Sequence, residues 1–323
     1  MSAFVISLDF EMFWGVADIA AIADYGPNVE GEWEAVPAML DMFRRYRVNA
    51  TWATVGMVMC RDYAQWRDWQ PEVMPGYRDP TLSTYSHGDR ARSNPRLFFG
   101  RPLVERILDT PGQELASHTY SHYLCDEEGA TPEQFAADMR CAAAIAEDVG
   151  VTLHSLVLPR NQVLETYLAM LPANGIRVFR GNGDHWIHRS GHAAPGGIAG
   201  RAARLADAWL PLRCATVQRE SLQNGLVNVP ASLFLRPWSR TLARLEPLRM
   251  HRLRDAMTDA ARGDGLFHLW WHPHNFGVNL AENMHMLEDL MQHYARLRDE
   301  YGMGSMTMRA FEQSHGDGHT VHS

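Results

Sequence analysis

The chain lacks lysine altogether, because all 30 basic side chains among its 323 residues are arginine. A lysine amine therefore cannot serve as a nucleophile or form a Schiff base, which excludes those enzyme classes. An excess of positive charge is also lacking, since acidic residues outnumber basic ones and the formal net charge is −8. We therefore expect no nucleic-acid partner, because such a partner requires a basic face.

Cysteines and long apolar runs are scarce as well. The four cysteines are widely spaced and form no Cys-x-x-Cys pair, which predicts neither a zinc knuckle nor a disulfide framework. No apolar stretch approaches the roughly 20 residues that span a bilayer. The N-terminal segment also lacks the basic region of a signal peptide. We therefore expect a cytoplasmic protein without a membrane span, whereas its oligomeric state is not predicted.

Short apolar runs alternate with amphipathic segments along the whole chain. The pattern predicts strands at 4–8, 49–58, 114–117, 153–158, 176–180, 226–230 and 266–271, and helices at 35–46, 131–149, 160–173, 242–261 and 282–301. This alternation indicates an α/β fold with a mainly parallel sheet wrapped by helices, open or closed into a barrel. We predict one domain over residues 1–312, with insertions near 61–100 and 187–260, and a disordered tail over 313–323.

Two histidines, His118 and His122, stand four positions apart in the segment SHTYSH. On one helical turn, or in a loop that enters one, this spacing places both imidazoles within reach of one ion. Neutral imidazole is the commonest protein ligand of divalent transition metals. The spacing alone is weak evidence among 16 histidines, so a third ligand is required.

Acidic side chains supply that ligand at the end of the first predicted strand. Asp9 and Glu11 are two positions apart, so in extended backbone they face the same side. Active sites of parallel α/β folds lie at the carboxyl ends of the strands, where His118 and His122 are also expected. Glu11 and the two histidines then form three ligands and leave Asp9 free. Three protein ligands leave one metal position open for water, which is typical of hydrolytic sites.

Five segments, SLDFE, SHTYSH, LPRNQ, GDHW and HLWWHPHN, resemble in this order the motifs of the polysaccharide deacetylases, the NodB-like carbohydrate esterases. The resemblance extends over about residues 4–311 and is to a branch with an Asp-x-Glu first motif. It implies a distorted (β/α) barrel and a bacterial metal-dependent amidohydrolase that acts on linear amides (EC 3.5.1.-). The implied substrate is an N-acylated, mainly N-acetylated, carbohydrate. The implied cofactor is one divalent ion, Zn²⁺ in the first place, with Co²⁺, Ni²⁺ or Mn²⁺ as alternatives.

The resemblance also implies roles for individual residues. Its metal ligands match Glu11, His118 and His122, and its general base matches Asp9. Its base-orienting arginine matches Arg160, and its aspartate that tunes the proton-donating histidine matches Asp184, with His272 as the donor. His274 competes for the donor role. The side chains expected at the substrate are Trp14, Trp186, Trp270, Trp271, His274 and Asn275.

Two departures from the family pattern keep alternatives open. Phe10 stands where the family usually has the second of two adjacent acids, which leaves a catalytically impaired sugar-binding relative as one alternative. Trp270 precedes His272 by two positions where leucine is usual, so the acyl pocket is expected to differ in shape. A formamide or cyclic-amide hydrolase of the same superfamily is therefore a second alternative.

Overall fold

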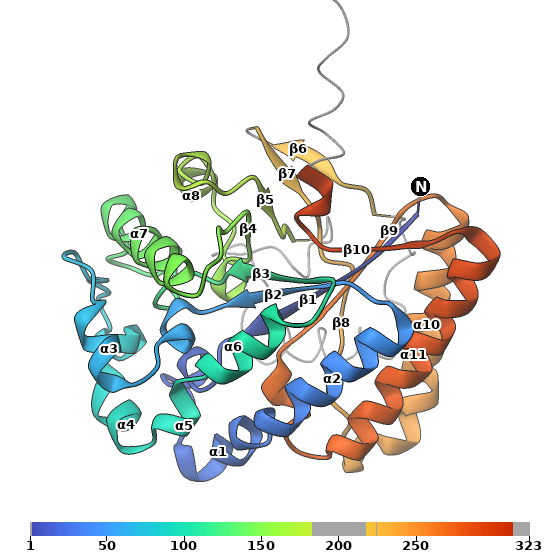
Figure 1. The fold of residues 1–323 in the computed structure, drawn as a ribbon, viewed down its shortest axis with the longest axis horizontal. Coiled ribbons are helices and arrows are strands. Elements are labelled where there is room, and N and C mark those ends of the chain that lie inside the picture. The colour runs from blue at the N-terminus through green and yellow to red at the C-terminus, as the bar shows by residue number, and fades with distance from the viewer. Residues whose placement is uncertain (1, 183–217, 224, 313–323) are drawn as a thin grey trace, which may run out of the picture.

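The computed structural model describes residues 2–182, 218–223 and 225–312, in which a mainly parallel sheet curls into a half-barrel wrapped by helices (Figure 1). The strand order is β6-β7-β5-β4-β3-β2-β1-β9-β8, and β10 pairs with the first part of β1. Of these pairings, only β6 with β7 is antiparallel. The strands are β1 (Ala3–Phe10), β2 (Ala50–Thr54), β3 (Gln113–Ser117), β4 (Ser155–Leu156), β5 (Val178–Phe179), β6 (Ser221–Gln223), β7 (Leu226–Asn228), β8 (Leu233–Phe234), β9 (Leu266–Trp271) and β10 (Gly304–Met306). The expected fold of parallel strands wrapped by helices is confirmed.

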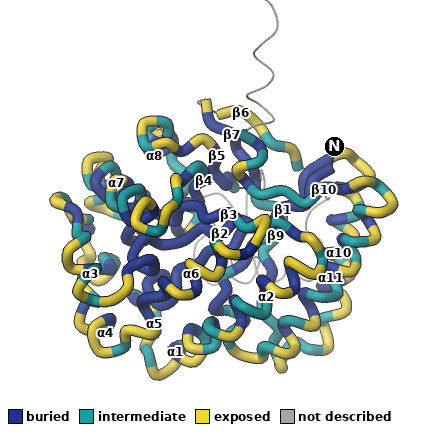
Figure 2. Tube along the Cα trace, in the orientation of Figure 1, coloured by how far each residue is buried: buried dark blue, intermediate teal, exposed yellow. Residues whose placement is uncertain are grey.

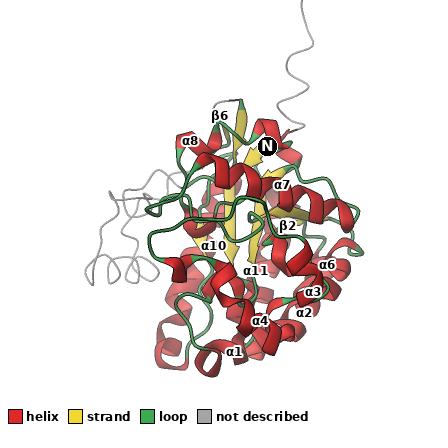
Figure 3. Ribbon diagram, turned by 90° about the vertical axis from the view of Figure 1, so that its left-hand side faces the viewer, coloured by secondary structure: helices red, strands yellow, loops and turns green. Residues whose placement is uncertain are grey.

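Helices cover the outer face of the sheet, and α2, α10 and α11 lie side by side along one flank (Figures 1 and 3). The α-helices are α1 (Ile22–Glu30), α2 (Glu32–Tyr46), α3 (Tyr63–Asp68), α4 (Gly88–Ser93), α5 (Pro95–Phe98), α6 (Arg101–Leu108), α7 (Pro132–Asp148), α8 (Glu165–Leu168), α10 (Glu246–Arg262) and α11 (Leu280–Tyr301). Among the described residues, none of these helices is both long and apolar enough to cross a membrane.

The central strand β1 has two different faces, as the alternation of side chains in a strand requires. Its even-numbered residues are apolar and pack beneath the helices. On the other face, Ala3 and Val5 join an apolar cluster inside the curl, and Ser7 and Asp9 follow them. Every residue of the strand is buried (Figure 2). The inner face therefore changes from apolar to polar toward the carboxyl end of the strand.

The start of helix α7 could be predicted from the sequence because its first residues form a capping box. Thr131 caps the helix by accepting from the backbone N–H of Gln134, whose side chain accepts in turn from the N–H of Thr131. The helix expected over 160–173 is wrong as a continuous element, because only α8 and short 3₁₀ turns form there. Left-handed backbone at Arg160 and Asn161, and a proline at 172, prevent one continuous helix.

The segment expected as an insertion at 61–100 contains the short helices α3, α4 and α5 and no strand. Of the second expected insertion, 187–260, residues 187–217 and 224 lie outside the described residues. The remainder contains β6, β7, β8 and most of α10. The expected tail at 313–323 also lies outside the described residues.

Candidate active site

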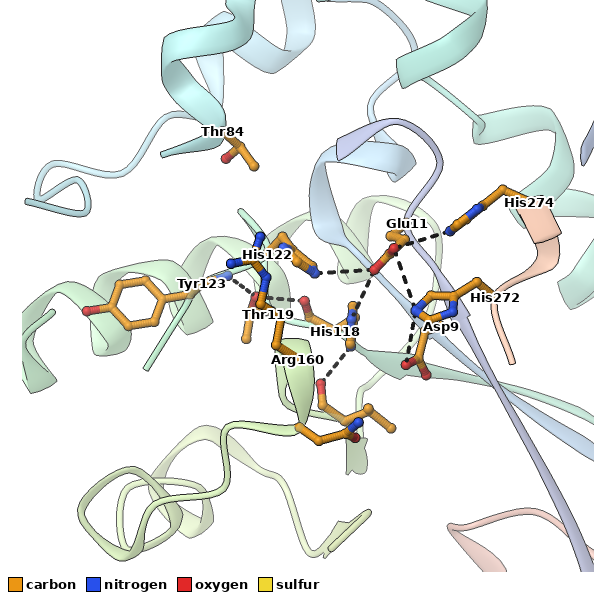
Figure 4. Close-up of polar contacts among 12 residues, drawn as sticks. Asp9, Glu11, Thr84, His118, Thr119, His122, Tyr123, Arg160, His272 and His274 are labelled. Carbon is orange, nitrogen blue, oxygen red and sulfur yellow. Dashed lines mark hydrogen bonds and ion pairs between the residues drawn. The ribbon is translucent and has the colours of Figure 1, made fainter. Parts of the chain in front are cut away.

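Polar side chains from five parallel strands meet at the carboxyl edge of the sheet, and Figure 4 shows those that follow β1, β3 and β9. They lie in or directly after the strands, where chain geometry lets side chains converge over the open end of the curl. They are Asp9 and Glu11 from β1, His118 and His122 after β3, Asn161 after β4, Arg180 after β5, and His272 and His274 after β9.

Glu11 lies between two histidines that were predicted to share a metal with it. Its Oε2 is 3.4 Å from Nε2 of His118 and 3.2 Å from Nε2 of His122, and all three side chains are buried. Zinc bonds of about 2.0–2.1 Å in tetrahedral geometry place neighbouring ligand atoms about 3.3 Å apart. One carboxylate and two imidazoles with this spacing fit a divalent transition metal.

The hydrogen bonding of His118 supports the same conclusion. Its Nδ1 lies 2.8 Å from the carbonyl oxygen of Val157, so Nδ1 carries the proton and donates to that carbonyl. In the neutral ring, the lone pair of Nε2 then points at Oε2 of Glu11. Two acceptors that face each other at this distance require a cation between them, either a metal ion or a proton on the imidazole.

The two histidines lie in a loop, which decides between the helix and the loop that the sequence allowed. Thr119 and His122 both adopt positive φ, at 61° and 55°, which a continuous right-handed helix excludes. The loop is held by Asp138 of α7, whose carboxylate accepts from the backbone N–H groups of Tyr120 at 2.6 Å and Ser121 at 3.0 Å. A buried acid on a neighbouring helix therefore fixes the conformation of the loop.

Gly15 provides the space that Glu11 occupies. A Cβ atom at this position would lie 2.0 Å from Cδ of Glu11, well inside contact distance. Any larger residue at position 15 would therefore displace the carboxylate. No pattern in the sequence marks this glycine.

Asp9 is held by Arg180 in a fully buried, two-pronged ion pair. Nη1 and Nη2 of Arg180 donate to Oδ1 and Oδ2 of Asp9 at 2.7 and 2.8 Å. Nη2 also donates to Oδ1 of Asn161 at 2.9 Å, and the guanidinium carbon lies 4.3 Å from the ring centroid of Trp270. This bidentate geometry fixes the orientation of the Asp9 carboxylate.

A second layer of buried residues orients Arg180. Its Nη1 donates to Oγ of Ser7 at 2.9 Å, and Oγ lies 2.8 Å from Nε2 of His268. Nδ1 of His268 lies 3.1 Å from the carbonyl of Val229 and donates to it, so Nε2 accepts from the Ser7 hydroxyl. Burial, with the charge of Arg180, lowers the pKa of His268 to about 3, so this imidazole is neutral.

Both carboxyl groups at the site are ionised. Burial is the largest single effect and raises the pKa of Asp9, but the charge and hydrogen bonds of Arg180, together with the nearby imidazoles, outweigh it and the net shift is downward. Burial likewise raises the pKa of Glu11, but the four imidazoles around it, His272 before the others, outweigh burial and bring the pKa well below the usual value. The site therefore carries two negative charges, one of which Arg180 balances.

His272 and His274 lie on the opposite side of Glu11 from the His118 loop. Nε2 of His272 is 3.7 Å from Oε1 of Glu11 and 3.9 Å from Oδ2 of Asp9, and a quarter of its side chain is exposed. His274 is buried, with Nε2 3.3 Å from Oε1 of Glu11 and Nδ1 2.7 Å from the hydroxyl of Tyr25. Burial lowers the pKa of His272 to about 4, although both carboxylates raise it, so the ring is neutral near pH 7.

Arg160, which was expected to orient Asp9, does not contact it. Arg160 pairs with Asp18 and is one-third exposed, and Arg180 occupies the place at Asp9 that was predicted for it. The reason is local, because positive φ at Arg160 and Asn161 turns the chain so that Asn161, and not Arg160, reaches Arg180. Asp184 lies outside the described residues, and so does Trp186.

The expected substrate-binding tryptophans separate into two groups. Trp14 and Trp271 are buried in the core, the first donating to the carbonyl of Phe98 and the second stacked against Phe276. The structure therefore places them away from a substrate, because packing onto the helices takes their ring faces. Trp270 is partly exposed at the site and covers Arg180. Asn275 accepts from the hydroxyl of Tyr25 at 3.1 Å.

Sequence reasoning missed Arg180, Ser7 and His268. Arg180 ends the strand predicted at 176–180, so the rule that strand ends carry the chemistry could have found it. Ser7 shares the face of Asp9 on β1. Nothing in the sequence marks His268, because a histidine inside an apolar strand is usually a satisfied core residue.

Glu32, the first residue of α2, is a buried acid near the site without a well-formed hydrogen bond. Burial raises its pKa well above the usual 4.5, the charge of Glu11 adds to this, and the backbone of His274 offsets a part. Above the unfolded-state pKa, the folded chain keeps a proton that the unfolded chain releases. The free energy of unfolding therefore falls as pH rises, by about 1.4 kcal/mol per pH unit until the raised pKa is reached.

We expect Glu32→Gln to remove this dependence. Its stability advantage over the unsubstituted chain should grow by about 1–3 kcal/mol between about pH 5 and pH 7. Urea denaturation in the presence of a chelator at several pH values measures the difference. Parallel pH dependences for the two proteins would show that Glu32 is ionised in the folded chain.

A model of the family described as "Polysaccharide deacetylase" matches residues 18–179, half of the chain. The match includes the His118 loop but begins after Glu11 and ends before Arg180. No curated protein matches the chain significantly in sequence.

Solved structures similar to this chain include three with the same overall fold. A protein of Mycobacterium smegmatis, provisionally described as a polysaccharide deacetylase, is 15% identical with a TM-score of 0.58, over 100% of this chain and 93% of its own. Puue allantoinase is 10% identical with a TM-score of 0.56, over 99% and 91%. A GH57 branching enzyme of Thermococcus kodakaraensis is 10% identical with a TM-score of 0.59, over 100% and 72%. These likenesses show the fold. Because the family model matches half of the chain, the chain belongs to the polysaccharide deacetylase family.

Proposed function

We propose that this chain is a metal-dependent amidohydrolase that removes an N-acyl group, N-acetyl in the first place, from a cytoplasmic sugar or polysaccharide precursor. One observation carries the proposal. Glu11, His118 and His122 form a buried three-ligand group beside a carboxylate, Asp9, that is ionised and fixed in orientation. This is the combination that hydrolysis of an amide requires, a site for a Lewis acid next to a general base.

Glu11, His118 and His122 would hold the metal ion, zinc in the first place. When bound there, such an ion polarises an amide carbonyl and lowers the pKa of a water molecule. Asp9 takes the proton of the attacking water, because Arg180 keeps it ionised and fixes its orientation, with Oδ2 3.9 Å from Nε2 of His272. The water oxygen joins the acyl carbon, and the bond from that carbon to nitrogen breaks.

The departing amine needs a proton, and His272 is the better placed of the two candidate donors. Its Nε2 lies 3.9 Å from Oδ2 of Asp9, so the proton that Asp9 accepts can pass to His272 and then to the amine nitrogen. His274 is less suited, because both of its ring nitrogens have partners in the buried interior. In this scheme the protons balance without any group outside the site.

The residues that contact the substrate are proposed from the exposure of their side chains at the site. Trp270 is partly exposed at the mouth of the site, with its ring against Arg180 and 4.6 Å from the ring centroid of Phe234. This aromatic wall suits the apolar part of an acyl group or one face of a sugar ring. Asn275, three residues after His272, is half-buried and remains a proposed contact of the sugar.

The experiment that tests the function uses metal-stripped protein with and without added zinc. N-acetylated sugars, nucleotide sugars and oligosaccharides are supplied, and released acetate, formate and ring-opened products are measured. Acetate released only with zinc supports the proposal. Formate or ring opening would replace it by the formamide or cyclic-amide alternative. Less than about a tenth of an equivalent of bound zinc, with sugar binding retained, would replace it by the impaired sugar-binding relative.

Substitution of one ligand gives a sharper result. We expect His118→Ala to lose tight zinc binding and, with it, acetate release, because one of three protein ligands and its lone pair are gone. Metal content after dialysis and acetate release measure the two losses. His251→Ala is the matched control, since His251 is two-thirds exposed and pairs with Asp255 on α10. Equal zinc content in the two variants would contradict the ligand assignment.

A further inference from the structure

Glu11 faces two pairs of histidines, one with each carboxylate oxygen (Figure 4). Oε2 faces His118 and His122, whereas Oε1 faces His272 and His274. In each triad the possible ligand atoms all lie within 4.8 Å of one another. We propose that Oε1 of Glu11, His272 and His274 form a second divalent-cation site, which fills after the first and inhibits the enzyme.

The hydrogen bonds of His274 orient it as a ligand. The Tyr25 hydroxyl donates its only proton to Oδ1 of Asn275 at 3.1 Å, so it accepts from Nδ1–H of His274 at 2.7 Å. The Nε2 lone pair of the neutral ring therefore points at Oε1 of Glu11, 3.3 Å away. This repeats the arrangement of His118, whose Nδ1–H donates to Val157. An outer partner that fixes the ring and its tautomer is typical of metal-binding histidines.

His272 completes the second triad on its open side. Its Nε2 is 3.7 Å from Oε1 of Glu11, close to the spacing of about 3.3 Å for two ligands of one zinc ion. Oδ2 of Asp9 lies 3.9 Å from the same nitrogen, but Arg180 already engages that carboxylate. Because a quarter of the His272 side chain is exposed, solvent and ions reach the site from this direction.

The second site is the weaker one for electrostatic reasons. Both sites share the single carboxylate of Glu11, and the positive charge of Arg180 balances Asp9. These residues therefore offer a second dication no negative charge beyond that of Glu11, which the first ion already uses. The two ions also repel each other. The second ion consequently binds at a higher metal concentration than the first.

Inhibition follows from the use of His272 and rests on the proposed function. An ion on Nε2 of His272 occupies the lone pair that would carry the proton from Asp9 to the leaving amine. Turnover should then fall as free metal rises through the range in which the second ion binds.

The test counts ions and does not depend on turnover. Metal-stripped full-length protein is dialysed against increasing zinc, and bound zinc per chain is measured together with circular dichroism. We expect two equivalents for the unsubstituted chain and for the control His285→Ala, whose histidine is exposed on α11. We expect one equivalent for His274→Ala and one for His122→Ala. One equivalent in the unsubstituted chain, or two in His274→Ala, would overturn the second site.

Tyr25→Phe keeps the proposal testable if His274→Ala does not fold. It removes only the hydroxyl that orients His274, so the second equivalent should bind about 10- to 100-fold more weakly while the first is unchanged. Unchanged affinity for both equivalents would overturn the proposal. One equivalent together with acetate release would leave the proposed function standing without the second site. Two equivalents without hydrolysis of any N-acylated sugar would support the site and remove the proposed function.

Discussion

Asparagine in place of Asp9 is expected to lower kcat by about 10²- to 10⁴-fold, the usual contribution of a general base. The amide has nearly the shape of the carboxylate but cannot take a proton from water at neutral pH. Zinc content should not change, because Asp9 does not belong to the Glu11–His118–His122 triad. Acetate release at saturating substrate and metal content after dialysis measure the two quantities.

The Asp9→Asn protein must be shown to be folded, since the substitution leaves the buried Arg180 without its charged partner. Circular dichroism and the free energy of unfolding of the same sample establish this. Asp41→Asn is the matched control, because Asp41 is exposed on α2 and makes only a surface ion pair. A kcat within tenfold of the control in a folded, zinc-loaded Asp9→Asn protein would show that another group is the base.

Glutamine in place of Arg180 is expected to cost about 3–5 kcal/mol of stability, the effect of removing one partner of a buried ion pair. Asp9 then remains buried without compensation, and the hydrogen bonds to Ser7 and Asn161 are also lost. Arg160→Gln is the matched comparison, because Arg160 is one-third exposed and pairs with Asp18. Its expected cost is only about 0–1 kcal/mol.

Urea denaturation of the two arginine variants, both without metal, measures this difference. Catalysis should follow the same order, since only Arg180 contacts the proposed base. Equal stability losses in the two variants would contradict the assignment of Arg180. A larger loss of kcat in Arg160→Gln would support Arg160 as the arginine that orients the base, as the family motif implies.

The fold was predictable wherever elements are long or strongly patterned. The strand at 266–271 was predicted with the bounds that the structure has, and α7 was readable from its cap and amphipathic face. The two-residue strand β8 was not predicted, because two residues show no periodicity. The three-residue strand β10 was not predicted either. It forms by pairing with β1, from which it is far apart in the sequence, so no local pattern indicates it.

The site was predictable where position along the chain decides position in space. Glu11, His118 and His122 meet because each follows a parallel strand, and motif spacing placed them correctly relative to those strands. The arginine was assigned to the wrong strand, because the sequence does not reveal the left-handed turn at Arg160 and Asn161. A motif also does not reveal whether a side chain is buried. Trp271 lies in the last motif, but it is buried and packs toward the helices, so it does not line the site.

The contact between Asp138 and the histidine loop means that this candidate metal-binding motif does not hold its conformation by itself. The six residues 117–122 carry both imidazoles. The acceptor for two of their backbone N–H groups is Asp138 of α7, which lies 17 and 18 residues later in the chain than these groups. A peptide of this segment, or its transfer into another scaffold, would keep the ligands and lose their arrangement. Any search or design based on the spacing of the two histidines must therefore include a buried acceptor on the neighbouring helix.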